Sequence, residues 1–121
     1  MDKADKSILL KRGGKEFKIE LKECSSLFSK AKGLMFLRRE KAKALLFNFK
    51  GNTMASIHSF FVFFPFIAIW LDEAGSIVEQ RVIQPFSPYI RPERQFNRLL
   101  EIPLNNNYKE VFDFIVGDRK L

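Results

Sequence analysis

The longest apolar stretch of the chain lies near its middle, from residue 57 to residue 71, and only one histidine and one serine interrupt it. Aromatic and β-branched residues dominate the stretch, which favours strand over helix, and it is shorter than the roughly 18–20 residues that span a bilayer. Pro65 cannot donate a hydrogen bond inside a central ladder, so the pattern predicts two strands, at residues 56–63 and 66–72. The second strand is apolar on both alternating faces, which predicts burial on both sides: Phe66, Ala68 and Trp70 on one face, and Ile67, Ile69 and Leu71 on the other.

Two tight turns predict β-hairpins on either side of this stretch. The Gly-Gly pair at residues 13–14 divides a hairpin that spans residues 7–21, because glycine permits positive φ at both central positions of a turn. In the second arm of that hairpin apolar and charged side chains alternate, as in a half-buried strand. Later in the chain, Asp72 and Gly75 occupy the first and fourth positions of a type I turn that leads into a strand at residues 77–83.

The rest of the pattern predicts shorter elements. Apolar residues at helical spacing follow a pair of serines in one segment and a run of asparagines in another, and both residue types cap helices. The predicted elements are helices at 25–35 and 106–113, strands at 44–49, 97–102 and 116–119, and an ordered proline-rich loop at 85–94.

Together these elements predict a mostly β fold (β-rich α+β), a compact antiparallel barrel-like sheet of about six to eight strands with one or two short helices. The length of 121 residues fits one core, so we expect a flexible N-terminus at residues 1–6 and a single β-rich domain at residues 7–121. Phenylalanine is frequent, with 14 copies, which we interpret as aromatic packing in the core. The expected core includes Leu46, Phe60, Val62, Ile69 and Leu71.

Charge is unevenly distributed along the chain. The formal net charge is +7, and counting along the sequence places 14 basic and 6 acidic side chains in residues 1–50, against 7 basic and 8 acidic ones in residues 51–121. The excess of lysine and arginine in the first part of the chain suits an anionic partner. It also suits a solvated lysine-rich surface without any partner, and the sequence leaves both interpretations open.

The chain contains one cysteine, Cys24, and one histidine, His58. A lone cysteine excludes an intrachain disulfide and a cysteine zinc site, and a histidine with no partner at metal-ligand spacing argues against any other metal site. We therefore expect no metal and no cofactor. The first six residues are charged and no apolar segment follows them, so we expect no signal peptide, no transmembrane segment and a cytoplasmic location.

Several short motifs recur together, in order, in a known family. They are Gly33-Leu34-Met35-Phe36, Leu45-Leu46-Phe47, Ile57-His58-Ser59-Phe60-Phe61, Phe64-Pro65, Trp70-Leu71-Asp72 with Gly75, Leu100-Glu101-Ile102-Pro103 and Val116-Gly117-Asp118. On these motifs the chain resembles the small, uncharacterised bacterial and archaeal proteins of domain of unknown function 192, from about residue 7 to its end. The resemblance implies a compact β fold with short helices and no accepted activity. Family members commonly carry an aspartate two residues after the proline, where this chain has Ile67.

Two residues suggest chemistry inside or beside the sheet. His58 is a candidate ligand contact at the end of the barrel, or else a buried imidazole that bonds to the backbone, Asp72 or Glu101. Glu101 points away from the apolar residues on either side of it, so it is either half of a salt bridge or a general acid or base in a pocket. The expected salt-bridge partners are Arg38, Arg39 and Arg98.

The proline-rich loop supplies the other candidates. Arg91, Arg94 and Arg98 lie close together along the chain, beside Tyr89, and arginine offers planar, bidentate donors to carboxylate or phosphate. The neighbouring prolines limit the movement of the loop, which lowers the entropy lost on binding. Pairing of these arginines with surface carboxylates is the alternative. The candidate ligand-binding residues are His58, Tyr89, Arg91, Arg94, Arg98 and Glu101.

These observations lead to three hypotheses for function. The leading one is an uncharacterised small cytoplasmic protein without catalytic residues, a binding or interaction module for a small or anionic ligand at the end of the sheet that residues 85–96 cover. The first alternative is a nucleic-acid-binding protein, based on the basic charge and the aromatic residues. The second is a small hydrolase or lyase that uses His58 and Glu101.

Overall fold

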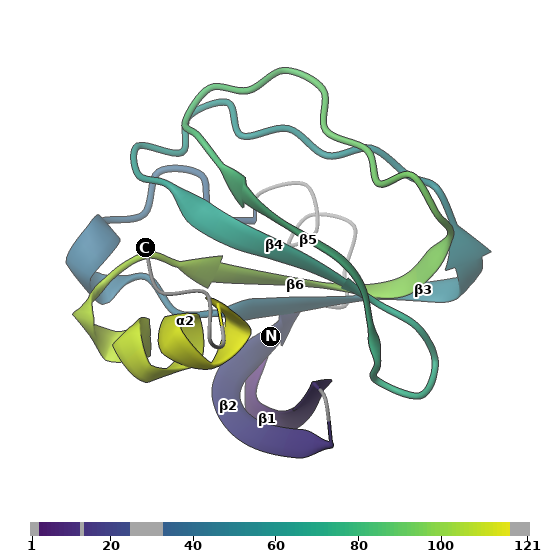
Figure 1. Cartoon of the computed structure of the whole chain (residues 1–121). Coiled ribbons are helices and arrows are strands. Elements are labelled where there is room, and N and C mark those ends of the chain that lie inside the picture. The colour runs from purple at the N-terminus through teal and green to yellow at the C-terminus, as the bar shows by residue number, and fades with distance from the viewer. Residues whose placement is uncertain (1–2, 13, 25–32, 117–121) are drawn as a thin grey trace.

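The computed structural model describes residues 3–12, 14–24 and 33–116 of the chain (Figure 1). Within these residues the chain forms one curled, half-barrel sheet, with two short 3₁₀ helices and one α-helix. None of the helices described is long and apolar enough to cross a membrane. The elements are β1 (Lys3–Arg12), β2 (Lys15–Cys24), η1 (Arg39–Lys41), β3 (Leu45–Thr53), β4 (Phe66–Leu71), β5 (Ile77–Ile83), β6 (Phe96–Pro103), η2 (Asn106–Tyr108) and α2 (Lys109–Val116).

The strands lie in the order β1-β2-β3-β6-β4-β5, which confirms the mostly β, barrel-like fold. All neighbouring pairs are antiparallel except β2 and β3, which run parallel. A parallel pair needs a crossover connection, and residues 33–44 are the described part of the segment between these two strands. At one end, Lys11 of β1 forms a bridge with Ser76 just before β5, so the two edge strands of the sheet approach each other there.

The central strand β4 is buried along its whole length, as predicted. Phe66, Ala68 and Trp70 belong to one hydrophobic cluster and the alternating residues Ile67, Ile69 and Leu71 belong to the other. Strand β4 therefore divides the apolar interior into two cores. Ile67 is 3% exposed and packs in the second core, on the α2 side of the sheet.

Both predicted hairpins are present. Arg12 pairs with Lys15, so the chain reverses between these two residues, and Gly14 has a φ of 79°. Between β4 and β5, the Asp72 carboxylate accepts hydrogen bonds from the backbone N–H groups of Ala74 and Ser76, both at 2.9 Å. These bonds hold the turn in which Gly75 adopts a φ of 87°.

The predicted strand at residues 56–63 is wrong. This segment is a loop that makes a single bridge, between Ile57 and Ile90, and its backbone turns where the N–H of Val62 donates to the carbonyl of Ser59 at 3.1 Å. Consequently Phe60 is 40% exposed and not a core residue. The other expected core residues, Leu46, Val62, Ile69 and Leu71, are buried.

The remaining predicted elements are placed as follows. The strands expected at 44–49 and 97–102 are β3 and β6, and the helix expected at 106–113 begins as η2 and continues as α2. The proline-rich segment 85–94 is an ordered loop. Most of the helix expected at 25–35, and the strand expected at 116–119 beyond its first residue, lie outside the described residues. Residues 33–36, at the end of that expected helix, form a turn.

Candidate functional site

Two loops and one turn meet at one side of the sheet, opposite α2 (Figure 1). The loops are residues 54–65, before β4, and residues 84–90, the first part of the segment that joins β5 to β6, and the turn is residues 33–36. Ile57 and Ile90 join the loops through two backbone hydrogen bonds of 2.8 Å. The backbone N–H of Phe36 donates to the carbonyl of Phe61 at 2.9 Å, which ties the turn to the first loop. Three segments that are distant in the sequence therefore form one surface.

Four exposed phenylalanines with contacting rings occupy this surface, and a fifth, Phe60, is exposed beside His58. Phe36, Phe61, Phe63 and Phe86 are 63%, 49%, 60% and 46% exposed. Their rings form a connected series, because Phe36 stacks on Phe61 with centroids 5.2 Å apart, and Phe86 contacts Phe61 and Phe63 edge to face at 6.1 and 5.3 Å. We call these four residues the aromatic surface. Contiguous exposed apolar groups of this kind mark interaction sites on soluble proteins.

The backbone beneath the aromatic surface is strained. Among the residues that the structure describes, only three other than glycine have a positive φ, and all three belong to this surface: Phe36 at 63°, Phe61 at 61° and Phe86 at 61°. A left-handed conformation costs about 1–2 kcal/mol for a residue with a Cβ atom, and bulky side chains rarely adopt it. The surrounding structure offsets this conformational cost at three positions, and the side chain at each of them is an exposed ring.

Ser59 is the residue that holds the two loops together. It is fully buried, and its hydroxyl donates to the carbonyl of Gln84 and accepts from the N–H of Ser87, both at 2.7 Å. Its backbone N–H donates to the carbonyl of Ser87, and its carbonyl accepts from the N–H of Phe86, both at 2.8 Å. Ser59 therefore fixes the positions of Phe61 and Phe86, which lie next to these bonds in the chain.

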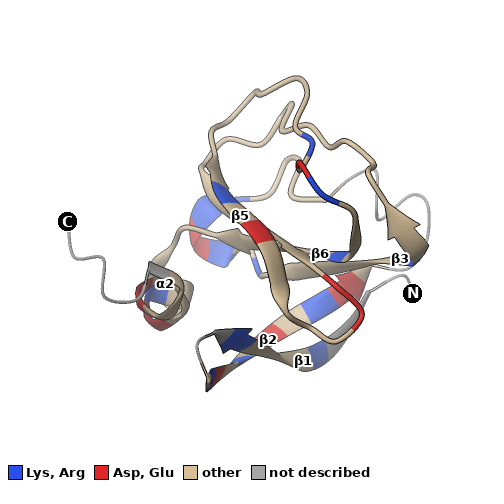
Figure 2. Cartoon of the chain, turned by 45° about the vertical axis from the view of Figure 1, so that its right-hand side comes forward, with Lys and Arg blue, Asp and Glu red and all other residues tan. Residues whose placement is uncertain are grey.

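The loops of the aromatic surface carry almost no formal charge. No Asp, Glu, Lys or Arg occurs in residues 51–71 or in residues 82–90, and Figure 2 shows these loops almost entirely tan. Charged residues lie at the margins instead. Residues 38–43 follow Phe36 and carry four basic side chains and one acidic side chain, while residues 91–94 follow the second loop with two basic side chains and one acidic side chain.

His58 and Tyr89, two of the candidate ligand-binding residues, lie on the loops of this surface. The His58 ring is 5.2 Å from the ring of Phe60, and its Nδ1 atom accepts a hydrogen bond from the Phe60 N–H at 3.1 Å. His58 is exposed, so the prediction of a buried imidazole is wrong, although the ring does bond to the backbone, which was one of the expected partners. Tyr89 is 64% exposed. No group of three or more potential metal ligands occurs among the described residues.

The three arginines of the candidate site do not form one cluster. Arg94 donates to the backbone carbonyl of Val78 at 2.6 Å, while Arg98 lies at the far hairpin, with its Nη2 atom 3.4 Å from the position that a Cβ atom on Gly75 would occupy. Arg91 is exposed, and its backbone carbonyl accepts a hydrogen bond from Arg81 at 2.7 Å. Of the three, Arg91 lies nearest along the chain to Tyr89 and the second loop.

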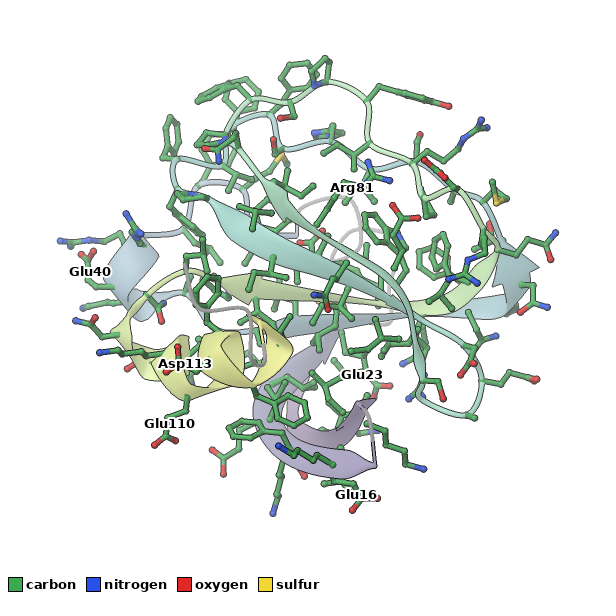
Figure 3. All side chains as sticks on the ribbon, in the orientation of Figure 1. Glu16, Glu23, Glu40, Arg81, Glu110 and Asp113 are labelled. Atoms are coloured by element: carbon green, nitrogen blue, oxygen red, sulfur yellow. The ribbon has the colours of Figure 1, made fainter. Side chains whose placement is uncertain are left out.

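Sequence reasoning missed Arg81, which anchors this part of the loop to the sheet (Figure 3). Its guanidinium lies over the Trp70 ring, 5.1 Å from the centroid, and pairs with the carboxylate of Glu79. Burial raises the pKa of Glu79, but the hydrogen bond from the Glu93 N–H, at 2.8 Å, and the contacts with Arg81 outweigh it and lower the pKa below its ordinary value. The sequence of β5 did not indicate this pair, because charged residues such as Glu79 and Arg81 are normally expected to face solvent on a strand.

Glu101 lies apart from the aromatic surface, in the middle of the sheet. On β6 it pairs with Leu45 of β3 and Ala68 of β4, and it is only 6% exposed. Burial raises the pKa of its carboxyl to about 8. Within the described ranges the structure shows no ion pair to Glu101, so the predicted salt bridge with an arginine is absent there. Its Oε1 atom is 3.5 Å from the place where a Cβ atom on Gly33 would lie.

His58 and Glu101 are not brought together. The histidine is exposed on a loop, while the glutamate is buried in the central ladder, and no hydrogen bond or ion pair joins them in the part of the chain described. A groove of about 760 Å³ lies elsewhere, between β2 and α2, and contains Lys6, Lys18 and Lys43 beside Glu20 and Glu110. Its lysines are partly balanced by these carboxylates, so it is a weaker candidate than the aromatic surface for a specialised site.

Comparison with known proteins identifies relatives by fold but not by activity. A putative transcription regulator from Sinorhizobium meliloti matches with a TM-score of 0.76 and 18% identity, over 93% of this chain and 89% of that one. A protein of unknown function from Novosphingobium aromaticivorans matches with a TM-score of 0.72 and 14% identity, over 89% of this chain and 79% of that one. No protein with a curated description matches the sequence. The model of domain of unknown function 192, described as Uncharacterized ACR, COG1430, matches residues 8–118, and the chain therefore belongs to that family.

Proposed function

We propose that this protein is a non-enzymatic binding module and that the aromatic surface is where it binds. The observation that carries the proposal is the left-handed backbone of three exposed phenylalanines, Phe36, Phe61 and Phe86. Strained residues persist where the surrounding structure over-determines them, and they cluster at functional sites. Rings that served only the core would be buried and would not require this backbone cost.

Two of the candidate ligand-binding residues support the same location. His58 and Tyr89 lie on the two loops that build the aromatic surface, and Arg91 follows the second loop. The expected site was the end of the sheet beneath residues 85–96, and the aromatic surface includes part of that loop. A cytoplasmic location remains part of this proposal, as does the role of these three side chains in contacting the bound partner.

The hydrolase or lyase alternative has little support, because it needs His58 and Glu101 in one pocket. Nucleic-acid binding is the stronger alternative, since exposed rings can stack on bases. The relative from Sinorhizobium meliloti carries the words putative transcription regulator, but it shares only the fold with this chain. Against nucleic acid, each nucleotide brings a phosphate, and the lysine and arginine side chains that could meet it lie only at the margins of the two loops and not beside the rings.

The proposal is tested by asking whether the rings serve binding or stability. Phe36→Asn, Phe61→Asn and Phe86→Asn remove the rings at positions where asparagine tolerates the left-handed backbone. We expect each variant to keep the free energy of unfolding within about 1 kcal/mol of the wild type, while binding of the neutral apolar dye Nile red to the folded protein falls at least severalfold. Leu9→Thr and Val82→Thr are matched controls, because these residues are 46% and 49% exposed outside the aromatic surface.

A loss of about 3 kcal/mol or more in each asparagine variant, the range for removing a core aromatic ring, would show that the rings are structural. Dye binding that is unchanged in these variants, or reduced equally in the two controls, would also refute the proposal. Binding of a fluorescent oligothymidylate that depends on Phe61 and Phe63 would instead support the nucleic-acid alternative.

A further inference from the structure

We infer that the partner of the aromatic surface is an anionic lipid bilayer, into whose interface the four phenylalanines insert. This inference rests on the proposed function and names the chemistry of what binds. Three features carry it: several backbone N–H groups at the loop tips are bonded within the protein, residues 51–71 and 82–90 contain no formal charge, and basic residues lie at the margins of the loops.

The first feature is internal hydrogen bonding at the loop tips. A bilayer interior offers no partner for backbone N–H groups, so a segment that enters it must satisfy them within the protein. The N–H groups of Phe36, Ser59 and Val62 donate to backbone carbonyls at 2.9, 2.8 and 3.1 Å. That of Phe60 donates to the His58 ring, and that of Phe86 to the Ser59 carbonyl at 2.8 Å. Among the described residues no hydrogen bond is made by the N–H groups of Phe61 and Phe63, so the loop tips suit the polar interface of a bilayer and not its hydrocarbon interior.

The second feature is the absence of charge over two whole loops. Ionised side chains are costly inside a bilayer, by about 2.5–3.5 kcal/mol for a single arginine or lysine at its centre. Residues 51–71 and 82–90 contain no Asp, Glu, Lys or Arg, yet they hold three of the four phenylalanines of the aromatic surface. The core of a protein interface is also poor in charge, so it is the basic margin that favours an anionic bilayer over a protein partner.

The third feature is the basic margin. Residues 38–43 carry four basic side chains and one acidic side chain, a local net charge of +3, and they begin two residues after Phe36. Lys41 and Lys43 are exposed, whereas Arg39 donates to the Leu104 carbonyl and Arg38 pairs with Glu40. Each basic side chain near an anionic bilayer adds about 1 kcal/mol of attraction. In a dimer formed through this surface the basic residues of the two copies would lie close together and repel each other, which argues against self-association there.

The test is sedimentation of the full chain with vesicles of phosphatidylcholine, with or without phosphatidylglycerol. We expect the wild type to sediment with the anionic vesicles, and more weakly with the neutral ones. Phe61→Asn combined with Phe63→Ser lowers the apparent affinity at least about tenfold, because two partly exposed rings no longer enter the lipid. Lys41→Glu combined with Lys43→Glu weakens binding to the anionic vesicles alone. Leu9→Thr and Val82→Thr leave binding within about twofold of the wild type.

Three results would overturn the lipid assignment. The first is a wild type that sediments with neither vesicle. The second is binding that disappears at high salt and ignores the phenylalanine variants, since that would be a surface charge effect alone. The third is binding of the oligothymidylate through the same rings. If Nile red binding still depends on Phe61 and Phe86 while vesicles are not bound, the binding surface stands and only its occupant is wrong.

Discussion

Replacing Glu101 with glutamine should remove most of the pH dependence of this protein's stability near neutrality. The buried carboxyl has a pKa of about 8 in the folded protein, against an ordinary value of 4.5. Between these two values the folded state holds a proton that the unfolded state has lost, so stability falls as the pH rises. Below pH 4.5 the Glu101 carboxyl is mostly neutral in both the folded and the unfolded state, so its burial does not lower the free energy of unfolding. Above about pH 8 the full cost applies.

The size of the effect follows from the difference between the two pKa values. A difference of about 3.5 units, at 1.36 kcal/mol per unit, corresponds to about 5 kcal/mol across the window, and to about 3 kcal/mol at pH 7. Glutamine has nearly the same shape and carries no charge. The Glu101→Gln variant should therefore match the wild type near pH 4.5 and become progressively more stable than it up to pH 8.

The measurement is urea unfolding of both proteins between about pH 5 and pH 9, with the free energy extrapolated to water. Glu79→Gln is the control, because the pKa of Glu79 is lowered below 4.5. The ionised Glu79 carboxylate contributes to stability above pH 4.5, and this contribution is lost only as the pH falls through the lower pKa of the folded state. Between about pH 5 and pH 9 the Glu79→Gln variant should therefore differ from the wild type in unfolding free energy by a constant amount. Parallel curves for the wild type and Glu101→Gln would refute the argument.

Three further substitutions test how the fold is held together, each by denaturant unfolding. Ile69→Ala should lose about 2–5 kcal/mol, because the side chain is fully buried in β4, and a loss below about 0.5 kcal/mol would contradict its central position. Ser59→Ala should lose about 1–3 kcal/mol, because the N–H of Ser87 loses its partner and the carbonyl of Gln84 keeps only its bond from the Ser87 hydroxyl, and it should also weaken dye binding at the aromatic surface; unchanged dye binding would show that Ser59 does not position the rings. Asp72→Ala should lose about 1 kcal/mol through its two turn hydrogen bonds, while Asp72→Asn should lose less, and equal losses would mean that the bonds contribute little.

The parts of the fold that could be predicted from sequence are those that neighbouring residues determine. Strand β4 was recognisable because both of its alternating faces are apolar, and each face does lie in its own core. The hairpin turns were recognisable because Gly14 and Gly75 permit the positive φ that the turns require. Alternation along β6 placed Glu101 on the face opposite Leu100 and Ile102 but did not show whether that face is buried, and in the structure both faces are buried there.

The loop at residues 56–63 could not be predicted in this way. Its composition is that of a strand, but its conformation depends on Ser59, whose hydrogen bonds reach Gln84 and Ser87, 25 and 28 residues away. Once this segment is a loop, Phe61 and Phe63 face solvent instead of the core. A signal was present in the sequence, since a long charge-free stretch with adjacent phenylalanines, broken by polar His58 and Ser59, contains more rings than one strand can bury.

The candidate arginines were misplaced for a related reason. Closeness along the chain suggested that Arg91, Arg94 and Arg98 share one site, but β6 begins at Phe96 and carries Arg98 toward the opposite hairpin. Arg94 is held by the carbonyl of Val78 on β5. Long-range pairing of this kind depends on the order of strands in the sheet, which local patterns do not encode.

The most direct test of the account is an amide NMR titration of the wild-type protein with lipid bicelles that contain phosphatidylglycerol. Binding through the aromatic surface predicts a contiguous set of shifted or broadened amides in residues 34–38, 57–63 and 84–90, absent in the Phe61→Asn, Phe63→Ser variant. Perturbations centred on the groove between β2 and α2, or spread evenly over the lysine-rich hairpin of β1 and β2, would contradict it.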